Sequence, residues 1–238
     1  MHQIEVNGLT VYVVRKKIKN LHLAVYPPNG RIRVAAPMRV NDEAVRLAVI
    51  SKLGWIKRQQ VKFVEQERES IREYVSGESH YFQGNRYLLN VIEHKGTPYV
   101  KIRNKKKIDL FIRSNSTHTQ RERVFSAWYR EHLRQILSSL ITKWEKKIDV
   151  RANDWVIKKM KTKWGSCNIE NRRILINLEL AKKSERCVEY IVVHELVHLL
   201  ERLHNDQFLS LMNKFMPNWK QYRDELNRMP LAHAEWEY

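Results

Sequence analysis

Two histidines enclose a glutamate in the run His194-Glu195-Leu196-Val197-His198. On an α-helix, side chains four residues apart lie on one face and about one turn, roughly 6 Å, apart along the axis. Both imidazoles could therefore reach one metal ion at the roughly 2.0–2.1 Å that zinc–nitrogen bonds have. Glu195 leaves the helix to one side of this pair, where its carboxylate could reach a water on the metal without binding the metal itself. The run predicts a metal centre with a general base beside it.

A third protein ligand and an open position for water would complete a catalytic zinc centre. His204 follows His198 at the point where the helix should end, and it is the nearest candidate. We expect one zinc ion at His194, His198 and His204, although nickel, cobalt and manganese could use the same ligands. The competing interpretation is a helix with two satisfied core histidines and Glu195 at the surface. The apolar residues around the motif argue against it, because burying two imidazoles and a carboxylate without a partner is costly.

Similarity to a known family extends over nearly the whole chain. The segments that carry it are Met160–Cys167, Ile176–Leu178, Tyr190–His198, His204 with Phe208 and, upstream, Arg33–Pro37, Trp55-Ile56 and Gly84–Tyr87. Together they resemble the YgjP-like family of predicted zinc metallopeptidases, which is itself similar to SprT-type zincins. One departure is the pair of residues around the third histidine: Leu203 precedes it and Asn205 follows it, where family members commonly have Asn before and Ser or Gly after.

The resemblance implies a zincin-like minidomain in which the strand at Ile174–Leu178 borders the metal cleft. It also implies the same site residues as the motif, with metal ligands at His194, His198 and His204 and a general base at Glu195. An extended peptide could then pair with this strand, which we expect to be an edge strand, and present its scissile bond to the metal.

We therefore predict a zinc-dependent hydrolase, and favour a metallopeptidase in which Glu195 takes a proton from a metal-activated water. A first alternative is a metal-dependent nucleotide pyrophosphatase, since the same chemistry can attack the phosphorus of a nucleoside triphosphate. The sequence has no Gly-rich phosphate loop to support it. A second alternative is a nucleic-acid-associated protein with a structural zinc, which ranks last because three histidines beside an available glutamate are typical of an open site.

The group that stabilises the developing oxyanion is less well defined by the sequence. The candidates for substrate binding are the backbone amides of Gly165 and Ser166 and the side chains of Tyr222 and Arg223. A loop glycine usually serves turn geometry, and a helical Tyr-Arg pair usually serves packing or solvation. We interpret Ser166 and Cys167 as loop residues rather than covalent nucleophiles.

The chain is strongly basic, with 44 Lys and Arg against 26 Asp and Glu and a formal charge of +18. The excess is heavier in the first 120 residues, and it favours contact with polyanions such as nucleic acid. The clusters Lys105–Lys107 and Arg15–Lys17 with Lys19 read more readily as solvated turns, but Tyr87, Tyr99 and Trp55 in the same region leave a nucleic-acid surface open. The expected substrate is a peptide or a nucleotide, and the sequence makes no prediction of the oligomeric state.

Cysteine content and hydropathy bear on the compartment. Only Cys167 and Cys187 are present, too few for a disulfide framework. The first residues lack the pattern of a secretory signal, and no apolar segment approaches the roughly 20 residues that cross a bilayer. We expect a cytoplasmic protein without membrane contact.

The periodicity predicts an α+β fold in two domains. Residues 1–118 should form a β-rich basic module, with a meander of three early strands, one long helix from Asn41 or Asp42 through about Arg72, and four further strands. Residues 119–238 should form a zincin-like metallohydrolase domain. It should hold a long helix from Thr119, a short antiparallel sheet around the Trp164–Cys167 loop, a helix from Ser184 through about Arg202, and two more helices. No internal repeat is visible in the sequence.

Overall fold

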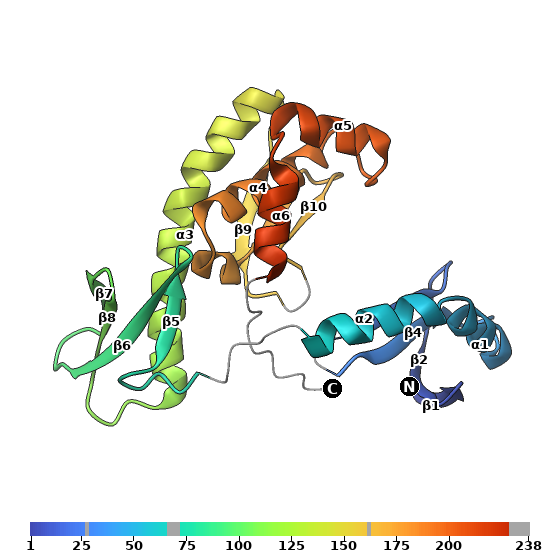
Figure 1. Cartoon of the computed structure of the whole chain (residues 1–238), viewed down its shortest axis with the longest axis horizontal. Coiled ribbons are helices and arrows are strands. Elements are labelled where there is room, and N and C mark those ends of the chain that lie inside the picture. The colour runs from blue at the N-terminus through green and yellow to red at the C-terminus, as the bar shows by residue number, and fades with distance from the viewer. Residues whose placement is uncertain (27–28, 66–71, 161–162, 229–238) are drawn as a thin grey trace. The chain divides into compact units, whose positions relative to one another are not determined.

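The computed structural model describes residues 1–26, 29–65, 72–160 and 163–228, and it confirms the α+β architecture (Figure 1). Two compact units are present, Met1–Arg68 and Glu69–Tyr238, called here the amino-terminal and carboxy-terminal units. The sequence had predicted the boundary at residue 118. The structure divides earlier, because the strands between residues 79 and 112 share one core with the long helix that follows them.

The amino-terminal unit is a four-stranded sheet with two helices. Its elements are β1 (His2–Val6), β2 (Leu9–Lys16), β3 (His22–Tyr26), β4 (Arg31–Pro37), α1 (Asp42–Ser51) and α2 (Leu53–Glu65). The strand order is β1-β2-β4-β3, with β4 parallel to β2 and antiparallel to β3. The expected meander is thus wrong, because β4 enters between β2 and β3. The single predicted helix is also divided at Lys52; its second part is described as far as Glu65, and Arg72, where the helix was expected to end, is not helical.

Local sequence signals explain these elements. Asn7 and Gly8 both have positive φ (48° and 74°), which suits the two-residue turn of a twisted hairpin. The side chain of Asn41 accepts a hydrogen bond from the Ala44 amide at 2.9 Å and so caps α1. Alternate residues of β2 and β4 pack with one face of both helices in a core that is almost fully buried: Val11, Val13, Ile32, Val34, Val45, Val49 and Ile56.

The carboxy-terminal unit begins with a second sheet of the same topology. Its strands are β5 (Ser79–Phe82), β6 (Asn85–Glu93), β7 (Tyr99–Asn104) and β8 (Lys107–Ile112), in the order β5-β6-β8-β7 with β6 and β8 parallel. Its first hairpin again turns through two residues of positive φ, Gln83 and Gly84. The structure therefore contains a topological repeat that the sequence did not reveal, because the two sheets share a strand order and turn geometry rather than an obvious residue pattern.

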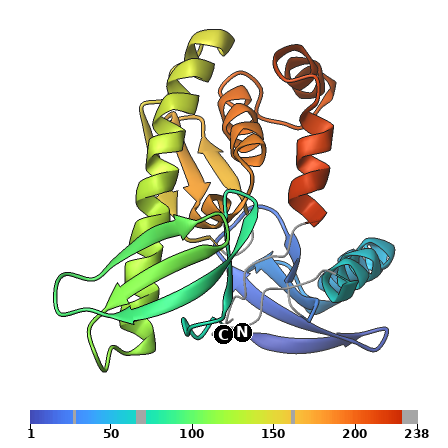
Figure 2. The ribbon, with the colours of Figure 1, turned by 60° about the vertical axis from the view of Figure 1, so that its left-hand side comes forward.

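The helix α3 (His118–Ile148) connects the second sheet to the rest of the unit. A capping box between Thr117 and Gln120 begins it, and Asp149, in the left-handed conformation at φ 61°, ends it. Its core face contains Phe125, Tyr129, Leu133 and Leu137, among other buried residues. In Figure 2, α3 runs along both the β5–β8 sheet and the elements that follow it.

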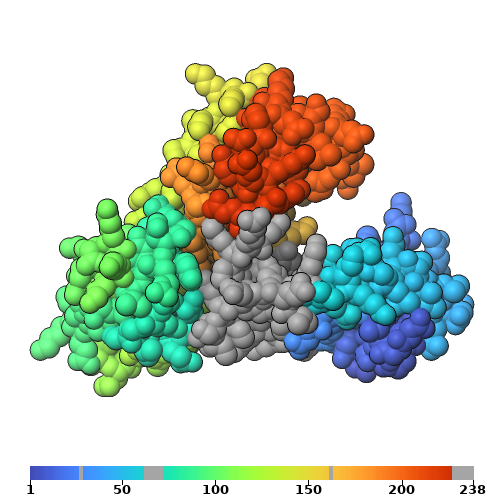
Figure 3. Space-filling model, in the orientation of Figure 1, coloured from blue at the N-terminus to red at the C-terminus, as the bar shows by residue number. Residues whose placement is uncertain are grey.

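The remaining elements form the half of the unit that contains the histidine motif. They are β9 (Asp154–Lys158), β10 (Gly165–Asn168), β11 (Arg173–Asn177), the 3-10 helix η1 (Leu178–Lys182), α4 (Glu185–Val197), α5 (Asp206–Phe215) and α6 (Trp219–Arg228). Figure 3 shows the surface of α5 and α6, in red, adjoining that of α3, in yellow. No described helix combines the length and the apolar character needed to cross a membrane.

The small sheet differs from the expected one in two respects. Its order is β10-β11-β9, and β11 is antiparallel to β10 but parallel to β9, so the sheet is mixed rather than antiparallel. The Trp164–Cys167 segment, expected as a loop, largely forms strand β10. As a result β11 lies in the centre of the sheet, and the prediction that Ile174–Leu178 is an edge strand is wrong. The edge strand that follows Trp164 is β10.

The shared core of the second sheet and α3 generates a test of the domain boundary. Leu133, fully buried in α3, should cost roughly 2–5 kcal/mol of stability when replaced by alanine. We expect hydrogen exchange in Leu133→Ala to rise together in β5–β8 and in α4, because both pack into one core. The exposed Ser139→Ala on the same helix should leave exchange unchanged. Unaltered protection of β5–β8 in Leu133→Ala would restore the boundary at residue 118.

Candidate metal centre

The helix α4 carries the histidine motif through the core of the carboxy-terminal unit. Nine of its thirteen residues are buried. It ends at Val197 rather than near Arg202 as predicted, and His198 is its C-cap residue. His194 and His198 therefore leave the last turn of the helix, at the point where the chain departs from the core. Asn205 accepts a hydrogen bond from the Phe208 amide at 3.0 Å and begins α5.

The structure brings the three predicted histidines together. Ligand-capable atoms of His194, His198 and His204 all lie within 4.8 Å of one another. The Nε2 atoms of His194 and His204 are 3.1 Å apart, and the ring centroids are separated by 4.7–5.0 Å. His204 comes from the segment between α4 and α5 and is exposed, while the other two are partly buried.

One aromatic side chain supports all three imidazoles. Phe208, 1% exposed in the first turns of α5, lies with its ring centroid 5.0 Å from His194 and 4.7 Å from both His198 and His204. The sequence analysis named Phe208 only within the family resemblance. Its position shows a packing role, because it restricts how each ring can rotate.

A hydrogen bond selects the nitrogen that His198 can offer. Its Nδ1 lies 3.0 Å from the backbone carbonyl of Glu201, an acceptor that requires a proton on Nδ1. The lone pair of Nε2 is then free to bind a metal. The Glu201 side chain also accepts a hydrogen bond from the Leu203 amide at 2.9 Å, which fixes the segment leading to His204.

Burial favours the neutral form of the His194 and His198 imidazoles. Desolvation, followed by repulsion from the other two histidines, lowers the pKa of His194 to about 3. Desolvation is also the main cause that lowers the pKa of His198. Neutral imidazole is the form that binds metal ions, and three imidazoles converging on one point suit a divalent transition metal such as zinc. The residues present therefore fit the metal that the motif predicts.

Glu195 is the one carboxylate of the motif, and it is only 4% exposed. Burial raises its pKa to about 8, and the charge of Lys163 partly offsets this shift. The carboxyl group can therefore exchange a proton near neutral pH, as a general base and acid must.

Gly165 makes room for Glu195. A Cβ atom at Gly165 would lie 2.5 Å from Glu195 Oε1, 2.8 Å from its Cγ and 2.9 Å from its Cδ, closer than such contacts allow. Gly165 is not among the described glycines that have a positive φ. The expectation that this glycine serves turn geometry is therefore corrected: it permits strand β10 to approach α4 closely.

A cavity of about 840 Å³ opens over these groups. The histidines and Glu195 line it together with β10, and the other charged side chains that line it in the described part of the chain are Lys163, Glu170, Arg202 and Arg223. Of the four predicted substrate-binding residues, Gly165, Ser166 and Arg223 line the cavity.

Two neighbouring residues are less suited to act on substrate. Tyr222 does not appear in the cavity wall, and its backbone carbonyl accepts a hydrogen bond from the Cys187 thiol at 3.7 Å. Cys167 does line the cavity, but burial raises the pKa of its thiol to about 11. The thiol form is a weak nucleophile, in agreement with the interpretation of Cys167 as structural.

Asn177 is a positioning residue that the sequence analysis quoted without assigning a role. Its side-chain amide, 4% exposed, donates to the carbonyls of Met160 at 2.9 Å and Lys163 at 2.8 Å, and its oxygen accepts from the amides of Met160 and Glu179. Its backbone amide donates to the Trp164 carbonyl at 2.9 Å. Asn177 therefore fixes the chain on the approach to Gly165. A polar residue ending the apolar run Ile174–Ile176 was the available signal.

Comparisons with solved structures give distant likenesses. The chain is similar to the metallopeptidase zymogen of Pyrococcus abyssi abylysin, with 19% identity and a TM-score of 0.36, over 38% of this chain and 90% of that one. It is also similar to the metallopeptidase zymogen of Methanocaldococcus jannaschii jannalysin, with 15% identity and a TM-score of 0.34, over 38% of this chain and 86% of that one. Likenesses at this level support no further statement about the chain.

Comparison with protein families is more informative, and a search of curated proteins gave no match. The model of the YgjP-like family, described as a metallopeptidase domain, matches residues 19–229. This range includes the histidine motif, Gly165 and most of both compact units. The chain therefore belongs to the YgjP-like metallopeptidase domain family.

Proposed function

We propose that the chain is a zinc-dependent peptidase in which His194, His198 and His204 hold the metal and Glu195 is the general base. The observation that carries the proposal is the convergence of three imidazoles beside a buried carboxyl group in one open cavity. Membership of a metallopeptidase family supports the choice of a peptide as substrate.

The roles of the side chains follow from their positions. A bound zinc ion would supply Lewis acidity to the attacking water and to the scissile carbonyl. Glu195 accepts a proton from that water and returns it to the departing amine. Gly165 and Asn177 act through position. Gly165 leaves space for the Glu195 carboxylate, and the side-chain amide of Asn177 holds the segment that precedes Gly165.

The edge strand β10 is the natural place for a peptide. Among the described residues its backbone pairs only with β11, so we propose that a peptide adds as a further strand on its other side. Because Gly165 to Cys167 also line the cavity, a peptide lying along β10 would pass close to Glu195 and the histidines. This arrangement replaces the earlier expectation that the substrate pairs with Ile174–Leu178.

Nucleotide hydrolysis remains the second candidate, and one observation favours it. Lys163, Arg202 and Arg223 line the same cavity and could contact phosphates. A structural zinc fits less well, because the site has a cavity and a buried carboxyl group beside the three candidate ligands that the described residues supply.

Replacement of Glu195 tests the proton-transfer role and the substrate class together. Glu195→Gln should retain zinc and lose activity by roughly 10²–10⁴-fold, because the amide cannot accept the proton. The purified protein, with zinc content measured, should be screened against a peptide library and nucleoside triphosphates. We expect cleavage of peptides that Glu195→Gln and a chelator both abolish. Full activity of Glu195→Gln would refute the assignment, and hydrolysis of triphosphates alone would select the second candidate.

The contact between Gly165 and Glu195 gives an independent test. Gly165→Ala should displace the carboxylate and reduce kcat about 100-fold or more while zinc content and folding are maintained. Ser166→Ala, one residue along the same strand, is the matched control and should keep most of the activity. Equal kcat in Gly165→Ala and the wild type would show that the carboxylate needs no such space.

A further inference from the structure

The sheet of the amino-terminal unit has two different faces. One face packs against α1 and α2 through the buried side chains already described. The alternate residues of β2, β3 and β4 must face the other way. The strand register places Tyr12 beside Arg33, Tyr26 beside Arg31, and His22 beside Ala35 on this second face.

Six aromatic or basic side chains lie on this second face, called here the aromatic-basic face, together with small or apolar ones such as Val14, Ala24 and Ala35. The six are Tyr12, Lys16, His22, Tyr26, Arg31 and Arg33. The guanidinium of Arg31 lies 3.6 Å from the centroid of the Tyr12 ring. Arg33 is exposed and has no ion-pair partner among the described residues. The four strands contain one acidic residue, Glu5, which lies on the same face at its β1 edge and accepts a hydrogen bond from Thr10.

The second sheet shows that this charge does not follow from the topology. In the matching strand β8, Asp109 occupies the position that Arg33 has in β4, between residues of the buried face. Asp109 is 4% exposed and is bonded by Arg103 at 2.6 Å and Asn90 at 2.9 Å. The corresponding position therefore holds a buried, paired carboxylate in the second sheet and an exposed arginine in the first.

The rest of the chain does not complement the aromatic-basic face in charge. Residues 1–68 contain 13 Lys and Arg against 5 Asp and Glu, and residues 69–238 contain 31 against 21, so both units are net basic. Lys16, Lys17 and Lys19 add charge where β2 ends. The other basic cluster, Lys105–Lys107, belongs to a hairpin turn in which Asn104 accepts hydrogen bonds from two of the lysine amides. The hairpin turn therefore accounts for this second cluster.

We propose that the aromatic-basic face binds single-stranded nucleic acid. Exposed bases can stack on tyrosine rings and guanidinium planes of an open four-stranded sheet, while arginine and lysine contact phosphates. A duplex would conceal its bases from such a face. The proposal concerns a site separate from the metal centre and does not depend on the proposed peptidase activity.

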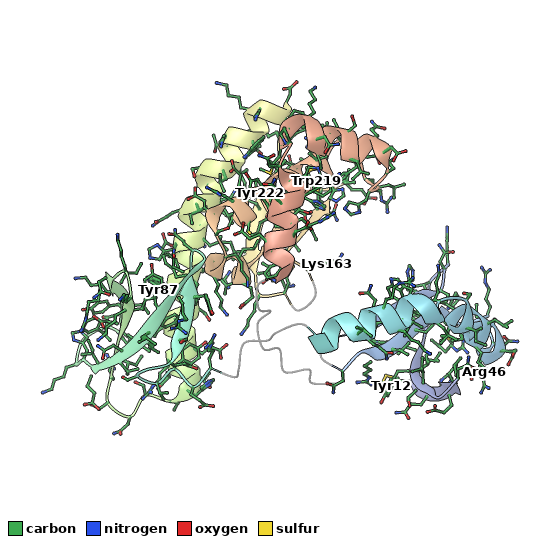
Figure 4. The ribbon with its side chains drawn as sticks, in the orientation of Figure 1. Tyr12, Arg46, Tyr87, Lys163, Trp219 and Tyr222 are labelled. Carbon is green, nitrogen blue, oxygen red and sulfur yellow. The ribbon has the colours of Figure 1, made fainter. Side chains whose placement is uncertain are left out.

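Two arginines of the same unit allow a matched test. Arg33 lies on the aromatic-basic face, whereas Arg46 is exposed on α1 in the helix layer, where Figure 4 labels it together with Tyr12 on the sheet. Binding of full-length protein to a fluorescein-labelled oligouridine of about 12 nucleotides is measured by anisotropy over a range of salt. Arg33→Gln should weaken binding severalfold and reduce the salt slope by about one, and Arg46→Gln should do neither.

Stacking needs a separate measurement, because phosphate contacts alone would also depend on salt. The wild type should prefer oligouridine to an abasic oligonucleotide of equal length by about fivefold or more. Tyr12→Leu should remove this preference without weakening binding to the abasic probe. Circular dichroism of each variant establishes that it is folded.

Three results would overturn the proposal. Equal losses in Arg33→Gln and Arg46→Gln would indicate diffuse charge attraction. Equal binding of the abasic probe and oligouridine by the wild type would exclude stacking. Binding of polyglutamate as tightly as oligouridine would identify an acidic protein as the partner of this face.

Discussion

The central physical constraint is the burial of polar side chains on a helix that is mostly buried. His194, Glu195 and His198 lie at the end of α4, and the apolar residues of this helix fill the core. Imidazoles and a carboxyl group in such a place must give up their charge or find a partner. The lowered pKa values of the histidines and the raised pKa of Glu195 express that cost. A divalent metal at the histidines would give their converging nitrogens a shared partner.

The surrounding elements serve to place these groups with little freedom. Phe208 packs against all three imidazoles, and the Glu201 carbonyl determines which nitrogen of His198 is available. On the opposite side, Asn177 holds the chain before β10, and Gly165 lets that strand approach Glu195. Rigid support of this kind is what a catalytic arrangement requires, because small displacements of a general base are costly.

Local pattern was sufficient to predict the motif and most helices, because four-residue spacing and capping residues act over short distances. His204 was also found, since it follows His198 closely in the chain. The roles of Gly165 and Asn177 could not be derived in that way, because each depends on which strand lies beside which helix. The edge-strand error has the same origin: Ile174–Leu178 reads as a strand, but its neighbours on both sides are set by long-range pairing. The domain boundary and the repeated sheet likewise follow from packing between distant segments.

The most direct test of this account is X-ray absorption spectroscopy of the zinc-loaded protein. We expect three histidine nitrogens and one oxygen ligand at roughly 2.0–2.1 Å, with one nitrogen ligand lost in His204→Ala. A first shell containing a sulfur ligand or four protein nitrogens would contradict the account, as would a spectrum that His204→Ala leaves unchanged.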